Sequence, residues 1–555
     1  MMKSIRTMRL LLLPLVFFVS GCQGLGLAKG KSEPLHFDVG ECRRAISTES
    51  PEAKLWFNRG LGLAFGFNHE EAIACFERAA LADPDCAMVY WGKAWALGTN
   101  YNSPTMTEEA SREAHLAVEK AMALRAACSP AERGLIEALR TRYEWPAPSD
   151  RSQLEHSYAA SMRRLRNAHP DDADIAALTA EALMQLRPWE LWSPSGEPAP
   201  ELAEVRAVLE PALERWPNHP ALCHFYIHAM EAGPEVQLAV PAAETLEKLT
   251  PGLGHLIHMP SHIYTWTGRY ADVIRVNIEA VAVDDAFVAE RGRENFYTAY
   301  RIHNYHFVAY GAMWDGQREL ALAYSRRLVD EIPASLLAAE PDLFDVFTAT
   351  PYHVMVRFGM WNELLEERKP AEELFASKAV WRYGRALALA ALGRVEEAIA
   401  EREAFLLAKE AVPASRLLFN NQVASILEVA DKVLEGEIEY RRENDEKAFT
   451  LLREAVRLDE LLNYDEPWGW MEPARHALGA LLVDRGRYGE AVDVYHANLE
   501  RYPGNGWALH GLAECLRALG HEREASAAEA RFREAWKRAD VEIPGSCFCR
   551  TQPAL

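Results

Sequence analysis

The feature that most constrains the fold is a repeat of about 34 residues that recurs at both ends of the chain. Near the N-terminus, its small, aromatic and proline positions are Trp56, Gly60, Ala72, Phe76, Ala79 and Pro84. Near the C-terminus, one copy holds Leu478, Gly479, Ala491, Tyr495 and Pro503, and the next holds Leu512, Gly520 and Ala525. Small residues let two helices approach closely, the aromatic ring fills the gap between them, and the proline ends the second helix.

This pattern resembles the tetratricopeptide repeat (TPR), a helix–turn–helix unit, with Arg59 and Leu63 in place of the usual Leu and Tyr. Helix-forming residues dominate the chain, and no run of alternating β-branched residues occurs. The resemblance implies an all-α fold, a TPR-type superhelical solenoid with inserted loops. Further repeats are expected to begin at Pro220, Gly254, Ile302 and Asp345, and loops are expected at residues 145–149 and 188–200.

The first residues are typical of an export signal. Three basic residues, Lys3, Arg6 and Arg9, precede an apolar run over residues 10–19. This run is shorter than the about 20 residues needed to cross a membrane. The sequence Val19-Ser20-Gly21-Cys22 resembles a bacterial lipobox. The resemblance implies that residues 1–21 are removed and that Cys22 is lipidated. It also implies that the protein is anchored in the cell envelope, facing the periplasm or the outer surface. The alternative is an ordinary signal peptide with a chance cysteine.

We expect the exported chain to form one solenoid after a lipidated tether over residues 22–50. Residues 51–378 form an N-terminal array with a histidine-lined concave groove, residues 379–540 a C-terminal array, and residues 541–555 a Cys-x-Cys tail. Apolar residues make up 49% and charged residues 25% of the chain, which excludes wholesale disorder. The net charge of −21 argues against a nucleic-acid partner, because phosphate binding needs a basic face.

Cys547 and Cys549 are separated by one residue, too close for an ordinary structural bridge. They form either a metal-binding or redox-active pair or part of a frayed tail, and the tail is the favoured interpretation. An exported protein can form disulfides.

Half of the 18 histidines lie between His219 and His353. Inside the four repeats from Pro220 onward, every histidine takes the second, fifth or ninth position: His224, His228, His255, His258, His262, His303, His306 and His353. Random placement would put about 0.7 of eight histidines there, given three positions in a repeat of about 34. Because steps of three and seven residues return to nearly the same side of a helix, these positions form one stripe. In TPR proteins this stripe faces the concave groove.

Imidazoles gathered on one wall favour a transition metal, with copper, zinc or iron as the candidates. The pairs His224 with His228 and His258 with His262 have the spacing of four residues that grips one ion from a single helix. Glu181, at the ninth position of the repeat expected near Ala173, or Glu231 would add an oxygen ligand or a base. The alternative is a polar groove whose histidines bond to each other, to carboxylates or to a peptide.

Signals for other cofactors are missing from the sequence. It contains no Cys-x-x-Cys-His for haem, no phosphate loop and no dinucleotide-binding glycine pattern, so nothing indicates haem, NAD or ATP. Three functions therefore stay open. The first is a metal-dependent centre, an oxidoreductase or hydrolase for a small exported substrate. The second is a TPR adaptor that binds a peptide or protein partner in the groove, and the third is a copper or zinc carrier. Imidazoles on a stripe where peptide grooves usually show Lys, Arg and Asn favour metal, without establishing catalysis.

Overall fold

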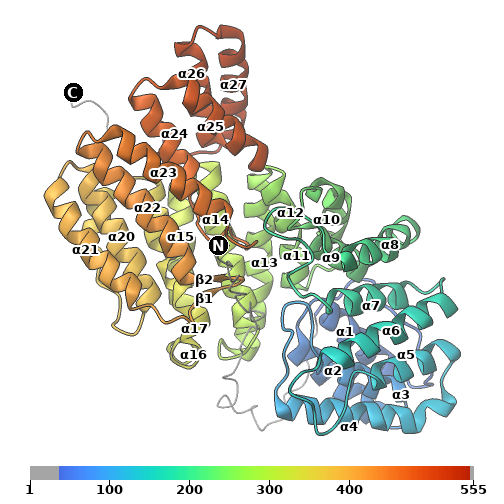
Figure 1. Cartoon of the computed structure of the whole chain (residues 1–555). Coiled ribbons are helices and arrows are strands. Elements are labelled where there is room, and N and C mark those ends of the chain that lie inside the picture. The colour runs from blue at the N-terminus through green and yellow to red at the C-terminus, as the bar shows by residue number, and fades with distance from the viewer. Residues whose placement is uncertain (1–36, 551–555) are drawn as a thin grey trace, which may run out of the picture.

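The computed structural model describes residues 37–550, and this part of the chain is mostly helical (Figure 1). Its N-terminal helices are α1 (Pro51–Phe65), α2 (His69–Ala82), α3 (Ala87–Ala96), α4 (Glu108–Leu124), α5 (Pro130–Arg140), α6 (Ser152–Ala168), α7 (Ala173–Met184), α8 (Pro200–Arg215), α9 (Pro220–Met230) and α10 (Val240–Leu246). The central helices are α11 (Gly254–His258), α12 (Pro260–Trp266), α13 (Tyr270–Arg291), α14 (Thr298–Asp315), α15 (Arg318–Glu331), α16 (Ala334–Ala339), α17 (Pro341–Phe344), α18 (Thr350–Arg357) and α19 (Trp361–Glu366).

The C-terminal helices are α20 (Phe375–Ala391), α21 (Val395–Glu410), α22 (Val423–Arg441), α23 (Asp445–Glu460), α24 (Ala474–Asp484), α25 (Tyr488–Arg501), α26 (Gly506–Ala518) and α27 (Glu522–Ala535). Short 3-10 turns cover Arg125–Ala127, Val236–Ala239 and Val346–Ala349. The short strands β1 (Leu417–Leu418) and β2 (Asn421–Gln422) pair antiparallel between α21 and α22. The all-α prediction is confirmed, and the loops expected at residues 145–149 and 188–200 lie between helices, except that Pro200 already begins α8.

Helices α1 and α2 show why the repeat sequence forms a helix pair. The Ser50 side chain caps α1 by accepting a hydrogen bond from the Ala53 amide, and Pro51 starts the helix. Gly60 lies against the Phe76 ring so closely that a Cβ at Gly60 would be 2.8 Å from it. The expected small-to-aromatic contact between the two helices is therefore present, and Gly479 makes the same contact with Tyr495 between α24 and α25.

The C-terminal repeats contact the centre of the chain as well as their neighbours in sequence. The Trp507 indole N–H donates to the Met313 carbonyl (3.0 Å), and the ring of Trp266 stacks on Tyr502 with centroids 5.4 Å apart. Trp266 also donates to Glu466 Oε1 (3.1 Å), in the loop between α23 and α24. In a simple solenoid each repeat contacts only its neighbours. Here the C-terminal helices also contact the centre of the chain, where α26 packs against α14.

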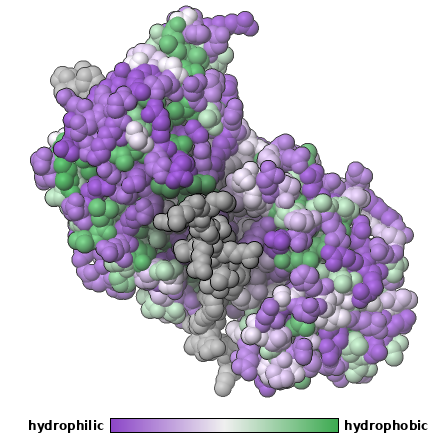
Figure 2. Space-filling view, in the orientation of Figure 1, coloured by the Kyte–Doolittle hydropathy of each residue, from purple (hydrophilic) through white to green (hydrophobic). Residues whose placement is uncertain are grey.

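Buried hydrophobic residues form two clusters. One runs from Val39 to Phe307 and the other from Tyr270 to Cys549, so the two interleave in α13 and α14. The border that we expected between residues 378 and 379 stays a prediction. The face of the molecule seen in Figure 2 is mostly hydrophilic, with small hydrophobic areas between the polar ones.

Two terminal segments differ from the sequence-based expectation. Residues 37–50, expected to be a loose tether, pack on the N-terminal helices: Cys42 is buried, and Arg44 pairs with Asp172 (2.9 Å) and Asp174 (2.8 Å). The reason is that a buried guanidinium there meets two carboxylates at the start of α7. The predicted signal segment and the lipidation site Cys22 lie outside the described residues.

The described part of the C-terminal tail, residues 541–550, is not frayed. Cys547 and Cys549 form a disulfide, and Cys549 is fully buried. Ser546 donates to the His476 carbonyl (2.8 Å), which ties this segment to α24. Burial and hydrogen bonding thus replace the loose tail that we favoured. Within the described residues, no helix has the length and apolar character needed to cross a membrane.

Candidate metal centre

Six of the predicted histidines come together in the middle of the chain. His224 and His228 lie on α9, His255 and His258 on α11, His262 on α12 and His303 on α14. The first five are at most 3% exposed, and His303 is half-buried. The repeat frame accounts for this placement, because each helix is the first of its pair and presents the same side to the interior.

The ligand atoms of these residues form two groups. His224, His228 and His255 make one group, the first triad, and His258, His262 and His303 make the second triad. Within each triad, one nitrogen atom of each ring lies within 4.8 Å of the other two. Both triads are therefore compact enough for their rings to converge on an ion.

Hydrogen bonds set the tautomer of four of the six rings. The Nδ1–H groups donate to the Phe65 carbonyl (His224, 2.8 Å), Glu231 Oε1 (His228, 2.8 Å), Asn277 Oδ1 (His258, 2.7 Å) and Glu231 Oε2 (His262, 2.7 Å). Asn277 presents its oxygen to His258 because its amide group donates to the Val273 carbonyl (2.8 Å). These oxygen atoms only accept, so Nδ1 carries the proton and Nε2 keeps its lone pair in the neutral ring.

Two pairs of Nε2 atoms face each other as a result. The Nε2 atoms of His258 and His262 are 2.7 Å apart, and those of His224 and His255 are 3.2 Å apart. Two ligands at about 2.0–2.1 Å from a tetrahedral ion lie about 3.3 Å apart. His255 can satisfy the second contact by protonating its own Nε2. In the His258–His262 pair both lone pairs point at each other, which requires a cation, either a proton or a metal ion, between them.

The electrostatics of the site keep most rings neutral. Burial lowers the pKa of His224, His255, His258 and His303 well below the ordinary value. A neutral ring has a lone pair to offer, so these pKa shifts favour metal binding.

His262 is the exception. Burial lowers its pKa, but the carboxylates of Glu466 and Glu231 outweigh burial and raise it to about 10. Burial alone would raise the pKa of Glu231, yet His228 and His262 lower it to about 2. Burial raises the pKa of Glu466 to about 7. Without an ion, His262 therefore holds the proton that separates it from His258, and a metal ion can replace that proton.

Among the six clustered histidines, three ring nitrogens have no hydrogen-bond partner in the described part of the chain. These buried atoms are Nε2 of His228, Nδ1 of His255 and Nδ1 of His303. Leaving a buried polar atom unpaired costs about 1–3 kcal/mol. Each triad contains at least one such nitrogen, which an ion would satisfy.

A pocket opens beside the second triad. His262, His303, His255 and Glu466 line one part of it. The rest is mainly aromatic and apolar: Trp189, Phe296, Ala299, Tyr300, Leu343, Phe347 and Phe419. Asn102, Asn420 and Asp465 add polar groups to a lining that otherwise suits a small, largely apolar molecule.

Three predicted site residues do not join this cluster. Glu181 lies against Arg142, 3.7 Å away, because α7 directs it toward the guanidinium between α5 and α6. His306 packs edge-on against Phe347, and His353 lies beside Trp470 and 3.4 Å from Glu472. The repeat positions of His306 and His353 match those of the clustered histidines, but α14 and α18 carry these two side chains past the second triad, toward the C-terminal core.

The sequence did not indicate two residues that support the site. Glu466 forms an ion pair with His262 from a loop far along the chain, and Asn277 belongs to the second helix of its repeat, outside the stripe. Neither has a local pattern that could have revealed it. Glu231, named from the sequence as an alternative to Glu181, does contact the cluster.

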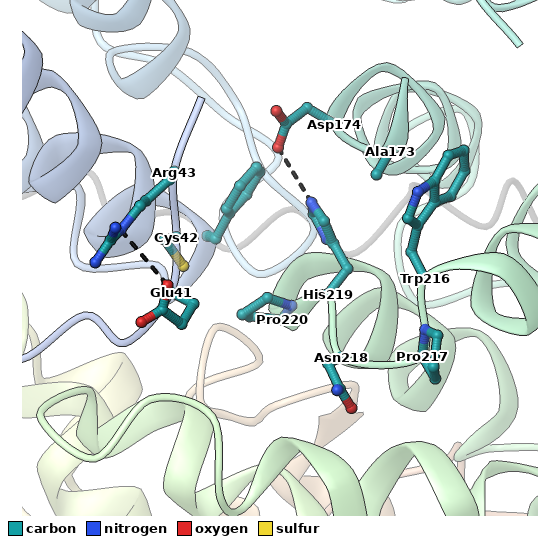
Figure 3. A pocket seen from close by; sticks show the side chains of 11 residues that line it. Glu41, Cys42, Arg43, Ala173, Asp174, Trp216, Pro217, Asn218, His219 and Pro220 are labelled. Atoms are coloured by element: carbon teal, nitrogen blue, oxygen red, sulfur yellow. Dashed lines mark hydrogen bonds and ion pairs between the residues drawn. The ribbon is translucent and has the colours of Figure 1, made fainter. Parts of the chain in front are cut away.

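His219, which lies just before the first histidine-bearing repeat, belongs to a separate surface pocket (Figure 3). Its Nε2 is 3.1 Å from Asp174 Oδ1, while Glu41 and Arg43 pair with each other on one side of the same pocket. Trp216 and Pro217 complete one wall. With one imidazole already bonded to a carboxylate, this pocket lacks the converging donors of the two triads.

Solved structures of TPR proteins are remotely similar. The chain is 13% identical to human IFIT1 in its dimer with m7Gppp-AAAA, covering 81% of this chain and 90% of that one, with a TM-score of 0.33. It is 12% identical to yeast Tom70, covering 87% and 96%, with a TM-score of 0.30. For the TPR domain of P58(IPK) the identity is 14%, covering 85% and 99%, with a TM-score of 0.21. Because these TM-scores are below 0.5, no binding property is carried over from these proteins.

The family comparison is more local. No curated protein sequence matches the chain significantly. Residues 482–535 match the family model of the tetratricopeptide repeat. The matched segment runs from the last turn of α24 to the end of α27. Helix pairs with the same glycine-to-aromatic contact stand at both ends of the described chain. The chain is therefore a helical protein that contains tetratricopeptide repeats, and the family match itself is limited to residues 482–535.

Proposed function

We propose that this protein binds a transition-metal ion, copper, zinc or iron, through the histidines of its concave groove. The single observation that carries the proposal is the pair of Nε2 atoms of His258 and His262, 2.7 Å apart. Asn277 and Glu231 hold the opposite nitrogen of each ring, so both lone pairs face the same point. Carbonyl and carboxylate partners of this kind orient metal-binding imidazoles and raise their basicity.

The adjoining pocket supports a role in chemistry on a small molecule. An ion with an open position can polarise a carbonyl, activate water or bind oxygen. The aromatic side chains around His303 favour an apolar or aromatic ligand. We therefore place a metal-dependent enzyme before a metal carrier, because buried ligands exchange an ion less readily than exposed ones.

A protein-binding adaptor is the second candidate, favoured by the family. Tetratricopeptide arrays most often bind other proteins, although a fold does not determine a function. Five of the six clustered histidines are at most 3% exposed, so a peptide would have to bind elsewhere on the array. The histidine stripe is thus better explained by an ion than by a peptide.

The test is elemental analysis of the purified mature protein beside two variants. We expect a tightly bound transition metal in the wild type and its loss in His258→Ala/His262→Ala. His510→Ala is the control, because His510 holds the fifth position of a C-terminal repeat and packs on Phe532. If the wild type neither co-purifies with a transition metal nor binds one tightly on addition, the metal proposal fails and the adaptor stands.

We also propose that the protein is exported and anchored through a lipid on Cys22. The support is the lipobox-like sequence Val19 to Cys22 after a basic start. Mass spectrometry of the mature N-terminal peptide from a bacterial host should find a diacylglycerol-modified Cys22. Cys22→Ser should abolish the modification and release the protein from the membrane fraction; an unmodified N-terminus at another residue would contradict the proposal.

A further inference from the structure

We infer that the groove holds two metal ions, one in each triad. This inference rests on the proposed function and adds the number of ions and the ligands of each. The first ion would be bound by His224, His228 and His255, and the second by His258, His262 and His303.

The repeat frame relates the two triads. In the first, the fifth and ninth residues of the repeat from Pro220, His224 and His228, meet His255, the second residue of the next repeat. In the second triad, His258 and His262 are the fifth and ninth residues of the repeat from Gly254. They meet His303, the second residue of the repeat from Ile302. One rule thus builds both sites, so they are equivalent positions of neighbouring repeats.

The same rule ends after two sites. A third site would need the fifth and ninth residues of the repeat from Ile302, His306 and Tyr310, and the second residue of the next, Val346. Only His306 has an imidazole, and its ring packs on Phe347. The number two therefore follows from the residues present in each repeat.

The two triads are in contact but use different atoms. Ring centroids of His255 and His258 are 5.8 Å apart, and those of His228 and His262 are 6.1 Å apart. Each triad also contains a buried nitrogen with no partner among the described residues: Nε2 of His228 and Nδ1 of His255 in the first, Nδ1 of His303 in the second. A single ion in one triad would leave the other unsatisfied.

Glu231 connects the two sites. Its Oε1 accepts from His228 (2.8 Å) and its Oε2 from His262 (2.7 Å), one histidine of each triad. It therefore acts as a positioning residue for both. In the described chain, the ion pairs of Glu231 and Glu466 are all with histidines. Two buried carboxylates without a Lys or Arg counter-charge suit a site that receives two cations.

The experiment counts zinc in the full mature protein. The protein is stripped with a chelator and equilibrated with Zn²⁺, and bound zinc is measured by elemental analysis and titration calorimetry. We expect two zinc ions per wild-type chain, one in His228→Ala, one in His303→Ala and none bound tightly in the double variant. His306→Ala is the matched control, one helical turn from His303 on α14, and should keep two.

The possible results separate this inference from the proposed function. One zinc in the wild type, lost in both single variants, means one shared site: the two-ion inference fails and the proposed function stands. No zinc, copper or iron bound to the wild type defeats both. Circular dichroism of the metal-free variants checks that they fold. If an alanine variant unfolds, His228→Gln or His303→Gln replaces it, and we expect the same number of bound zinc ions.

Discussion

At the scale of single residues, the environment decides whether a polar side chain binds, positions or only packs. Asn277 and Glu181 are both buried and both lie on helices near the groove. Asn277 accepts from the Nδ1–H of His258, so it would act on the proposed metal site through that ring. Glu181 faces Arg142 instead and has no part in the site.

Asn277→Ala should weaken metal binding without removing a ligand. The loss of its carbonyl oxygen frees His258 to rotate and change tautomer, and such losses cost about 10–100-fold in affinity. Competition of the protein with a chelator for Zn²⁺ measures the change. Asn498→Ala is the control, because Asn498 bonds His476 outside both triads (3.1 Å). Equal affinities for wild type and Asn277→Ala would show that this hydrogen bond does not orient the ring.

Glu181 should make the protein less stable as the pH rises. Burial raises its pKa from 4.5 to about 7, despite the opposing effect of Arg142. Between these values the folded state keeps a proton that the unfolded state has released, so the free energy of unfolding falls with rising pH. The full effect is about 3 kcal/mol, reached above pH 7.

Urea unfolding at pH 4.5 and pH 7.5 tests this effect. Glu181→Gln should gain stability relative to wild type between the two pH values, by up to about 3 kcal/mol. Glu214→Gln, on the exposed face of α8, should follow the wild type. A Glu181→Gln curve parallel to the wild-type curve would exclude a raised pKa at this carboxyl.

At the scale of helices, the repeat depends on glycines that let a first helix touch an aromatic ring. Gly479 on α24 and Gly511 on α26 both approach Tyr495, which fills the space between three successive helices. A Cβ would lie 2.6 Å from the ring at Gly479 and 2.3 Å at Gly511. The regular spacing of glycine and aromatic residues in the sequence thus reflects these helix–helix contacts.

Gly479→Ala should therefore destabilise the C-terminal array, by about 1–3 kcal/mol for overpacking. Gly489→Ala, on α25 with nothing within 4 Å of the added Cβ, should be neutral or stabilising by up to about 1 kcal/mol. Thermal unfolding followed by circular dichroism compares the two. Similar melting temperatures for both variants would mean that Tyr495 moves aside freely.

At the scale of the whole molecule, contacts between the C-terminal repeats and the centre of the chain complete the histidine cluster. Arg538 bonds the buried Asp315 at the end of α14 (2.8 Å), and Asp540 accepts from the amides of Arg318 (2.7 Å) and Glu319. These contacts hold α26 and α27 against the centre. The loop with Glu466 reaches His262 from the same C-terminal region.

Arg538→Ala should loosen the packing of the C-terminal repeats against the centre, because it leaves Asp315 buried without its charged partner. Removing one partner of a buried ion pair costs about 3–5 kcal/mol of stability. The Arg538 side chain is about one-third exposed, so we expect a loss of stability at the lower end of this range. Hydrogen exchange of residues 461–473 should become faster. Arg533→Ala removes an exposed pair with Glu529 and should leave exchange unchanged. Unchanged exchange in Arg538→Ala would show that this packing does not depend on the pair.

The sequence by itself determined the all-α fold, the helix pairs and a stripe of eight histidines, six of which gather, because these depend on periods within a repeat and between neighbouring repeats. It could not determine that Glu181, His306 and His353 lie apart from the others, since side-chain direction near an inserted segment depends on packing. Only the tertiary structure decided that Glu466 reaches the site. Trp266 and Glu466 are separated by 200 residues and meet because small rotations between repeats add up and bring the C-terminal repeats against the centre of the chain.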